Sequence, residues 1–390
     1  MREINNIIEK KSQFFVEKKL LCYNIFWSDI MKIVIATGGT GGHIYPATTL
    51  ADKLMSDDKS NEILFIGNHD RMEATEIPKL GYRFIGIKAA KFNSNNEKLN
   101  AIIVLYKAYK ECMHILEDYK PDIVLGFGGY VTVPVIMAAV KLKIKTIIHE
   151  QNSLPGLANR TLSHFVDKVV ICYESAKKAF NKKKTLLLGN PRESAALNFV
   201  KDPSIFKQFG LDCSKKTLLI VMGSLGSTSV NERMMGILEG LKQKDFNIIY
   251  VTGRNNYQSV IDNISESANL KIVDYVNQFD IAGNCALVVS RGGATSASEY
   301  MALGIPAIII PSPYVTNNHQ YENAKAMFDC GAAYLLEEKD LNVNNTISII
   351  DKLMNDDKKL KEMATAAKKM SHPNAAYDII KLIKEVAGKN

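Results

Sequence analysis

The feature that most constrains this chain is an alternation of short β-branched runs with longer helical stretches, which starts at Lys32. The first series contains the runs KIVIAT, EILFIG, RFIGI, DIVLGF, KTIIHE, KVVIC and TLLLG. After a turn-rich stretch at residues 189–204, a second series follows with KTLLIVMG, FNIIYVTG, LKIVDYV, ALVVSRGG and PAIIIPSP. Strands alternating with helices in this way predict parallel sheets with helices on both faces. The sequence therefore predicts an α/β protein with two doubly wound domains.

The length agrees with two domains, because 390 residues exceed the roughly 250–300 at which a single core stops growing. We expect an N-terminal domain at residues 31–192 and a C-terminal domain at 193–372. Residues 373–390 are expected to form a final helix that returns to the N-terminal domain. Residues 1–30 form an extension that lacks the apolar core and cleavage site of a signal peptide. Met31 is a possible alternative start, because MKIVIATGG resembles the beginning of a domain.

Composition excludes several classes of protein. No apolar run reaches the ~18–20 residues of a membrane span. Six cysteines without CxxC spacing indicate neither a zinc site nor a disulfide framework, which fits a reducing cytosol. The net charge of +8 is compatible with an anionic membrane surface, a phosphorylated substrate or nucleic acid, and equally with an ordinary soluble basic enzyme.

Polar and glycine-rich loops follow the predicted strands in both halves. Ligands of doubly wound sheets bind beyond the carboxyl ends of the strands, so these loops are the candidate site. The simplest arrangement is two sites that face each other across one cleft. The loops are GGTGGH, GFGGY, HEQNSLPG, GNPRE, GSLGSTS, YVNQF, SRGGATSASE and PSPYVTNNHQ.

The loop at Gly38–Gly42 lies between a strand and a helix, where bare backbone N–H groups and the helix dipole can meet an anion. It is not a P-loop, because no Gly-Lys-Ser/Thr follows, and it fails the G-x-G-x-x-G spacing at Ile44. A tight structural turn is the simpler alternative. His43 follows the glycines directly, and an imidazole there can donate to a phosphate or move a proton near neutral pH.

Three later loops offer polar side chains with competing interpretations. Ser296 and Glu299 have the S-x-x-E spacing of a capping box, which needs no ligand, whereas Glu299 can also accept ribose hydroxyls. Glu150, Gln151 and Asn152 end a predicted buried strand and suit a sugar. The stretch NHQ at residues 318–320 begins a predicted helix. Its side chains could contact a ligand, or Asn318 could simply cap the helix.

Two motifs are missing from the sequence. There is no Asp-x-Asp triplet, so a metal held by carboxylates at a diphosphate is not suggested, and we expect no metal and no cofactor. There is no P-loop lysine either. Charge on a leaving group would then be met by glycine-loop amides, helix N-termini and Arg or Lys side chains.

Seven of these motifs, in order and at matching intervals, resemble the family 28 glycosyltransferases of the GT-B fold. They are GGTGGHIYPA, GFGGYV, HEQNSLPGLANR, GNPRE, GSLGS, RGGATSASE and PSPYVTNNHQYENA. The resemblance runs from Met31 to the end of the chain. It implies two Rossmann-like domains that face each other across a cleft.

The activity implied by the resemblance is a step of peptidoglycan synthesis. N-acetylglucosamine would pass from UDP-N-acetylglucosamine to the C4 hydroxyl of the muramyl-pentapeptide on undecaprenyl diphosphate (lipid I), with inversion. The enzyme would be peripheral to the cytoplasmic face of the bacterial membrane, with an anionic membrane surface as a partner and no nucleic acid.

The resemblance also implies roles for individual residues. His43 and Glu150 are the catalytic candidates, with His43 as the first choice of general base. Acceptor positions are Gly41, Gly42, Tyr130 and Asn159. Donor positions are Thr40, Gly41, Gly42, Asn152, Arg192, Ser224, Val276, Ala294, Thr295, Ser296, Glu299 and Gln320. Arg192 lies one position earlier than in family members that read GNPVR.

A basic and partly apolar stretch at residues 91–110 coincides with the membrane-facing patch of the family. We expect Phe92, Leu99 and Ile103 to touch lipid while the lysines meet anionic headgroups. A helix that turns its apolar side toward its own core is the alternative.

Three other functions are alternatives to this transferase activity. A GT-B enzyme with another acceptor, such as diacylglycerol or a different polyprenyl-linked sugar, differs only in its N-terminal motifs. A nicotinamide-dependent oxidoreductase is disfavoured by the failed G-x-G-x-x-G spacing. A non-catalytic protein that only binds a sugar nucleotide would not explain the motifs GFGGY and HEQN.

Overall fold

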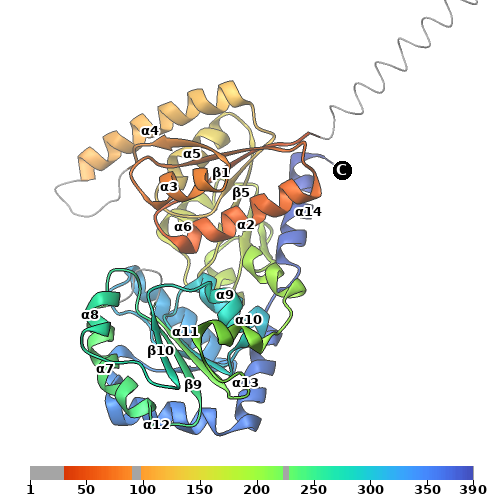
Figure 1. Cartoon of the computed structure of the whole chain (residues 1–390). Helices are drawn as coiled ribbons and strands as arrows, with labels where there is room; N and C mark the ends of the chain where they lie inside the picture. The colour runs from red at the N-terminus through yellow and green to blue at the C-terminus, as the bar shows by residue number, and fades with distance from the viewer. Residues whose placement is uncertain (1–29, 90–97, 223–227, 390) are drawn as a thin grey trace, which may run out of the picture. The chain divides into compact units, whose positions relative to one another are not determined.

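The computed structural model describes residues 30–89, 98–222 and 228–389, which Figure 1 shows as ribbons. The chain divides into two compact units. The first comprises the described parts of Met1–His149, Thr161–Lys168 and Ile380–Asn390, and the second comprises Glu150–Arg160 and Val169–Ile379.

Helices and strands alternate along the described chain. The elements before residue 190 are β1 (Lys32–Ala36), α2 (Gly41–Asp57), β2 (Glu62–Asn68), α3 (Met72–Lys79), β3 (Arg83–Ile87), α4 (Lys98–Tyr119), β4 (Ile123–Gly126), α5 (Thr132–Lys141), β5 (Lys145–Glu150), α6 (Leu157–Leu162), β6 (Lys168–Ile171), η2 (Glu174–Ala179) and β7 (Thr185–Leu187). Those after it are η3 (Pro191–Asn198), η4 (Pro203–Phe209), β8 (Thr217–Val221), α7 (Thr228–Leu241), β9 (Asn247–Val251), α8 (Tyr257–Ile261), β10 (Leu270–Val273), α9 (Gln278–Asn284), β11 (Leu287–Ser290), α10 (Ala294–Leu303), β12 (Ala307–Ile309), η5 (Thr316–Asn318), α11 (His319–Asp329), β13 (Ala333–Leu335), η6 (Glu338–Asp340), α12 (Val343–Met354), α13 (Asp357–Met370) and α14 (Ala375–Ala387).

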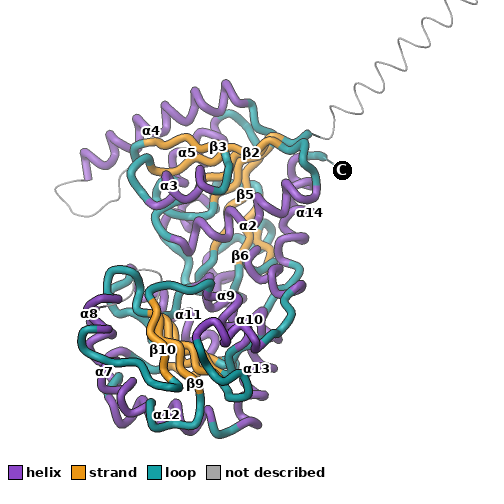
Figure 2. The backbone as a smooth tube through the Cα atoms, in the orientation of Figure 1, coloured by secondary structure: helices purple, strands orange, loops and turns teal. Residues whose placement is uncertain are grey.

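The strands form two sheets, drawn in orange in Figure 2. The first has the order β3-β2-β1-β4-β5-β6-β7, and the second has the order β10-β9-β8-β11-β12-β13. In the first sheet β1 is parallel to both β2 and β4, so Ala36 lies opposite Ile66 and Gly126. In the second sheet β8 is likewise parallel to both β9 and β11. The predicted α/β class with two doubly wound, Rossmann-like units is confirmed.

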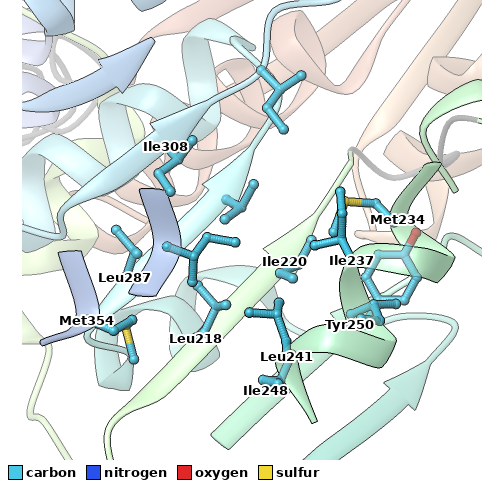
Figure 3. Packing of buried hydrophobic residues seen from close by; sticks show 14 of the residues in the cluster. Leu218, Ile220, Met234, Ile237, Leu241, Ile248, Tyr250, Leu287, Ile308 and Met354 are labelled. Atoms are coloured by element: carbon cyan, nitrogen blue, oxygen red, sulfur yellow. The ribbon is translucent and has the colours of Figure 1, made fainter. Parts of the chain in front are cut away.

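Burial on both faces explains why the central strands are nearly continuous apolar runs. All five residues of β8 are buried, as are all five of β9. Figure 3 shows Met234, Ile237 and Leu241 of α7 packed against side chains of this sheet, including Leu218 and Ile220. The helical spacing of these three α7 residues gives one apolar stripe that covers the sheet.

Each predicted run became a strand, and the sequence missed one. The missed strand, β13, has only three residues and pairs with β12 alone among the described strands. A three-residue edge strand carries too little periodicity to be distinguished from a loop. None of the described helices is both long enough and apolar enough to cross a membrane.

Both strand orders reverse beside the first strand of the sheet. The reversal lies between β1 and β4 in one sheet and between β8 and β11 in the other. In doubly wound sheets the crevice at such a switch point is where ligands bind. The loops that leave these four strands are therefore the places to look for function.

Candidate functional site

The first switch point brings two glycine-rich loops into contact. Gly38–Thr40 follows β1, and Phe127–Val131 follows β4. A Cβ on Gly129 would lie 2.5 Å from the Gly38 carbonyl oxygen, so only glycine permits this approach. The backbones of the GGTGGH and GFGGY loops therefore pack directly against each other.

His43 is held in the first turn of α2 beside this contact. Its N–H donates to the Thr40 carbonyl at 3.0 Å, and Thr40 is the N-cap residue with extended backbone. The imidazole packs on Gly128, where a Cβ would lie 2.8 Å from the ring Nδ1. Gly128 has a φ of +98°, which an L side chain rarely adopts. The half-buried ring therefore has a defined place at the end of the sheet.

The other first-unit candidates also lie at this switch point. Thr40 begins α2 without a side-chain cap, and Gly41 and Gly42 form the first residues of the helix. Tyr130 is half-buried in the loop after β4. The described positions can present helix N-terminal amides and an imidazole to a ligand.

Glu73 is a residue that the sequence reasoning missed. It lies in the first turn of α3 and is fully buried. Its Oε2 accepts the N–H of Gly39 at 3.0 Å, so this carboxylate contacts the glycine loop directly. A glutamate in the first turn of a helix is common, because the helix dipole favours a negative charge there, so its position along the chain does not indicate this contact.

Glu150 organises the loop that follows β5. Its Oε1 accepts from the backbone and side-chain N–H groups of Asn152, at 3.0 and 3.1 Å. Its Oε2 accepts from Gly156 N at 3.0 Å and from Asn159 Nδ2 at 2.9 Å. Glu150 is only 1% exposed. The structure therefore brings the predicted residues Glu150, Asn152 and Asn159 together, around a carboxylate that is saturated with hydrogen bonds.

Asn323 of α11 joins this loop to the strand exit after β11, and no sequence pattern indicated this role. Its Oδ1 accepts from Ser153 N at 2.8 Å and Ser153 Oγ at 3.0 Å. Its Nδ2 donates to Asn152 Oδ1 at 3.2 Å and to the Gly292 carbonyl at 3.0 Å. The loop that carries Asn152 is thereby fixed relative to the loop that opens α10.

The second switch point presents the N-terminus of α10. Gly293 is the N-cap, and a Cβ built on it would have no atom of the described residues within 4 Å. Ala294 and Thr295 are buried behind it, each 8% exposed. Backbone N–H groups at the start of a ten-residue helix favour an anion.

The capping box allowed by the spacing of Ser296 and Glu299 is not formed, because α10 begins at Ala294 and Ser296 lies inside the helix. Ser296 Oγ instead accepts from Gln278 Nε2 at 3.0 Å, and Gln278 also donates to Tyr300 Oη at 2.9 Å. Val276 lies two residues before Gln278 and is 9% exposed. This link holds the Val276 loop against α10.

Glu299 forms an ion pair with Arg192 of η3. Arg192 Nε lies 2.7 Å and Nη2 2.6 Å from the same oxygen, Oε1. The guanidinium also lies over the Phe279 ring, 5.8 Å from its centre. Burial raises the pKa of Glu299, and the Arg192 charge acts against that shift. The predicted donor residues Arg192 and Glu299 are therefore in contact, and both Arg192 nitrogens lie against the same carboxylate oxygen.

The remaining predicted donor residues are Gln320 and Ser224. Gln320 accepts the Ser312 N–H through its Oε1 at 2.9 Å, so it orders the loop after β12. Ser224 lies outside the described residues. Within the described ranges, no group of three or more His, Cys, Asp or Glu side chains is arranged to hold a metal ion.

Glu193, beside Arg192, is a buried carboxyl that the sequence reasoning also missed. Its Oε1 accepts from Asn190 N at 2.9 Å, and its Oε2 accepts from His372 N. Asn190 Oδ1 in turn accepts from Arg192 N, which completes a capping box at the start of η3. Burial raises the pKa of Glu193 to about 7, although the hydrogen bonds from His372 and Asn190 lower it.

This raised pKa predicts a pH dependence of stability. The pKa in the folded protein lies above the ordinary value of 4.5, so the folded state binds more protons between about pH 4.5 and 7. Its contribution is fully present below pH 4.5 and is lost as the pH rises through 7. Glu193→Gln, which does not titrate, should therefore show a melting temperature that falls less than that of the wild type over this range.

Differential scanning calorimetry at pH 5, 6 and 7 measures this difference. Glu174→Gln, at a glutamate whose side chain is 68% exposed, serves as the matched control and should keep the wild-type slope. Parallel curves for the wild type and Glu193→Gln would contradict the assignment.

Comparison with known proteins agrees with the two-unit architecture. Residues 33–171 match the glycosyltransferase family 28 N-terminal domain, and residues 217–381 match the glycosyltransferase family 28 C-terminal domain. The two matches together place this chain among the glycosyltransferases of family 28.

Relatives of known name narrow the class. A protein of Halalkalibacterium halodurans, named UDP-N-acetylglucosamine–N-acetylmuramyl-(pentapeptide) pyrophosphoryl-undecaprenol N-acetylglucosamine transferase, is 39% identical over 363 residues, which are 92% of this chain and 100% of the relative. The protein of the same name from Lactobacillus acidophilus is 39% identical over 367 residues, with 92% and 100% covered. This chain belongs to the family of these N-acetylglucosamine transferases.

A solved structure supports the same placement. The crystal structure of MurG from Acinetobacter baumannii superposes with a TM-score of 0.74 at 26% sequence identity, covering 91% of this chain and 99% of that one.

Proposed function

We propose that this enzyme transfers N-acetylglucosamine from UDP-N-acetylglucosamine to the C4 hydroxyl of the muramyl-pentapeptide on undecaprenyl diphosphate, with inversion at the anomeric carbon. The observation that carries the proposal is the match of both halves to family 28 together with 39% identity over the full length of relatives with this named activity. The product would be the β-1,4-linked disaccharide on the lipid, and UDP would leave.

The second unit is the proposed donor site. The N-terminus of α10 at Gly293 suits a diphosphate, because helix N-terminal amides and the helix dipole stabilise negative charge that grows on the leaving group. The Arg192 contacts fall on Oε1 of Glu299, so Oε2 is the atom we assign to the ribose hydroxyls. Val276, held near α10 through Gln278, suits the base. Asn152 and Gln320 are assigned to the donor sugar.

The first unit is the proposed acceptor site, with His43 as general base. During transfer the C4 oxygen attacks the anomeric carbon, the bond from that carbon to the diphosphate oxygen breaks, and the hydroxyl proton passes to the imidazole. His43 is half-buried, whereas Glu150 is 1% exposed and its oxygens accept four hydrogen bonds. A base must reach its proton, so accessibility favours His43 over Glu150.

A transfer assay tests the proposal. The purified protein is incubated with labelled UDP-N-acetylglucosamine and lipid-linked muramyl-pentapeptide, in buffer with EDTA and in parallel with Mg²⁺. Label is expected in the lipid under both conditions. No transfer to this acceptor, with transfer to diacylglycerol in a parallel tube, would assign a different acceptor to the same fold.

We further propose that the enzyme works at the cytoplasmic face of the membrane and binds anionic lipid through α4 and α5. Ile102, Ile103 and Tyr106 of α4 are 55%, 46% and 59% exposed. Beside them a groove of about 380 Å³ is lined by Leu105, Tyr106, Tyr109, Val133, Pro134, Met137, Val140 and Lys141. Apolar groups ringed by lysines suit the boundary between lipid headgroups and acyl chains. Of the positions predicted to touch lipid, Phe92 and the side chain of Leu99 lie outside the described residues.

Vesicle binding should depend on two lysines of α4. Lys107 and Lys110 are exposed beside the apolar groups, and each lysine near an anionic surface contributes about 1 kcal/mol. Replacing both with alanine should therefore weaken binding to anionic vesicles by roughly 30-fold, as measured by sedimentation. Lys358→Ala with Lys361→Ala, at exposed positions of α13, is the matched control. Equal binding of the wild type to neutral and anionic vesicles would contradict the proposal.

A further inference from the structure

Glu73 is a buried carboxylate to which the proposed chemistry assigns no role. It is 0% exposed and lies in α3, outside the two glycine-rich loops. A charged group is stable in such a place only when hydrogen bonds replace water. Three N–H donors do so: one comes from Gly39 in the loop after β1, and two come from Asn68, the last residue of β2.

The three hydrogen bonds divide unevenly between the two oxygens. Oε2 accepts from Gly39 N at 3.0 Å. Oε1 accepts from Asn68 N at 3.0 Å and from Asn68 Nδ2 at 3.3 Å. Asn68 in turn accepts the Ala89 N–H at 3.2 Å through its side-chain oxygen. The Glu73 carboxylate therefore connects the ends of β1 and β2, and Asn68 extends the link to Ala89 in the segment after β3.

The carboxylate also packs against the glycine loop. A Cβ on Gly38 would lie 2.2 Å from Glu73 Oε1, and Gly39 adopts a φ of +93°. The Gly39 N–H points to the other carboxylate oxygen, Oε2, so that amide is directed toward the buried side chain. The other side of Gly38 touches Gly129, in the loop on which His43 packs.

We propose that Glu73 is a positioning residue for the acceptor reaction, which sets the backbone of Gly38–Gly39 and through it the start of α2 with His43. This inference rests on the proposed function of the first unit. Misplacing a reacting group by 1 Å can lower a rate by about 10²-fold. We therefore expect loss of the hydrogen bond between Gly39 and Glu73 to lower the reaction rate as well as the stability of the fold.

Glu73→Gln separates the two sides of the carboxylate. The Gln oxygen can replace Oε1, which keeps both bonds from Asn68, but its NH₂ then faces the Gly39 N–H as a second donor. The opposite orientation loses two bonds to keep one, so it is disfavoured. The substitution thus preserves volume and removes the Gly39 contact selectively. Glu76→Gln, one turn along α3 at a partly exposed position, is the matched control.

Steady-state kinetics with both substrates test the inference. We expect Glu73→Gln to lower kcat/KM for the lipid acceptor by about 10- to 100-fold while KM for UDP-N-acetylglucosamine stays within about twofold. Glu76→Gln should match the wild type in both. A lower melting temperature with unchanged kinetics for both substrates would overturn the inference and leave Glu73 a purely structural role.

Residue-resolved hydrogen exchange of the wild type and of Glu73→Gln provides a readout that does not depend on activity. The Gly39 amide should exchange more slowly than expected for an exposed loop, and in Glu73→Gln it should exchange at least about tenfold faster. Fast exchange of Gly39 in the wild type would overturn the inference. A wild type that fails to transfer to the lipid acceptor, but protects Gly39, would instead refute the proposed function and leave the hydrogen bond in place.

Discussion

Replacing His43 with alanine is expected to lower kcat by roughly 10²- to 10⁴-fold, the range typical for loss of a general acid–base group. The imidazole is held on Gly128 at the end of the first sheet, and it is the ionisable group of the GGTGGH loop. Steady-state rates at saturating donor and acceptor measure the effect. KM for UDP-N-acetylglucosamine should change little, because the residues that we assign to the ribose, the base and the donor sugar belong to the second unit.

The control for this experiment is His114→Ala, at a histidine of α4 whose side chain is 84% exposed. It should leave kcat unchanged. If His43→Ala kept full turnover with a lower melting temperature, the ring would only fill space over Gly128, and Glu150 would become the remaining catalytic candidate.

Replacing Glu299 with alanine should mainly weaken donor binding. Hydrogen bonds to a charged group contribute about 1.5–3 kcal/mol, so loss of the ribose contact should raise KM for UDP-N-acetylglucosamine by roughly 10- to 150-fold. The variant also leaves Arg192 without its carboxylate. That guanidinium is 28% exposed, so water can solvate it, and the loss of stability should stay below the 3–5 kcal/mol of a fully buried pair.

Isothermal titration calorimetry with UDP, together with thermal unfolding, separates the two effects. Arg192→Ala is the informative companion, because it removes the ion pair and keeps the carboxylate. A Glu299→Ala variant that binds UDP as tightly as the wild type would show that this carboxylate serves the ion pair alone.

The fold was predictable because its signal is local. The seven runs of the first half and the five predicted in the second are short, β-branched and bounded by turn formers, and each one became a strand. Their order in the sheets follows from the handedness and short connections of parallel α/β units. The three residues of β13 carried no such pattern, since their place depends on pairing with β12.

The candidate site was predictable only in part. Sequence position relative to a strand end identified the loops of His43, Glu150 and Glu299. The contacts that join these loops to distant parts of the chain could not be read from the sequence, whereas the partners of Glu150 lie within nine residues of it. Arg192 is 107 residues from Glu299, and Asn323 is 170 residues from Ser153.

Two buried carboxylates could not be recognised from the sequence for a further reason. Glu73 and Glu193 lie in the first turns of helices, where acidic residues are common on electrostatic grounds alone. Their burial distinguishes them, and burial of a single carboxylate leaves no periodic trace. The capping-box spacing of Ser296 and Glu299 was misleading because a spacing does not show where a helix begins. Helix α10 begins at Ala294, which excludes the capping box.

The hydrogen bonds of Asn323 restrict which amino acids can occupy position 323. Its amide oxygen accepts two hydrogen bonds and its amide nitrogen donates two, so the whole bonding capacity of the side chain is occupied. Aspartate would lack the donors, glutamine would place the amide one methylene too far, and alanine would leave four partners unsatisfied. Position 323 is therefore expected to admit a single amino acid among all twenty, although it touches no substrate in the proposed reaction.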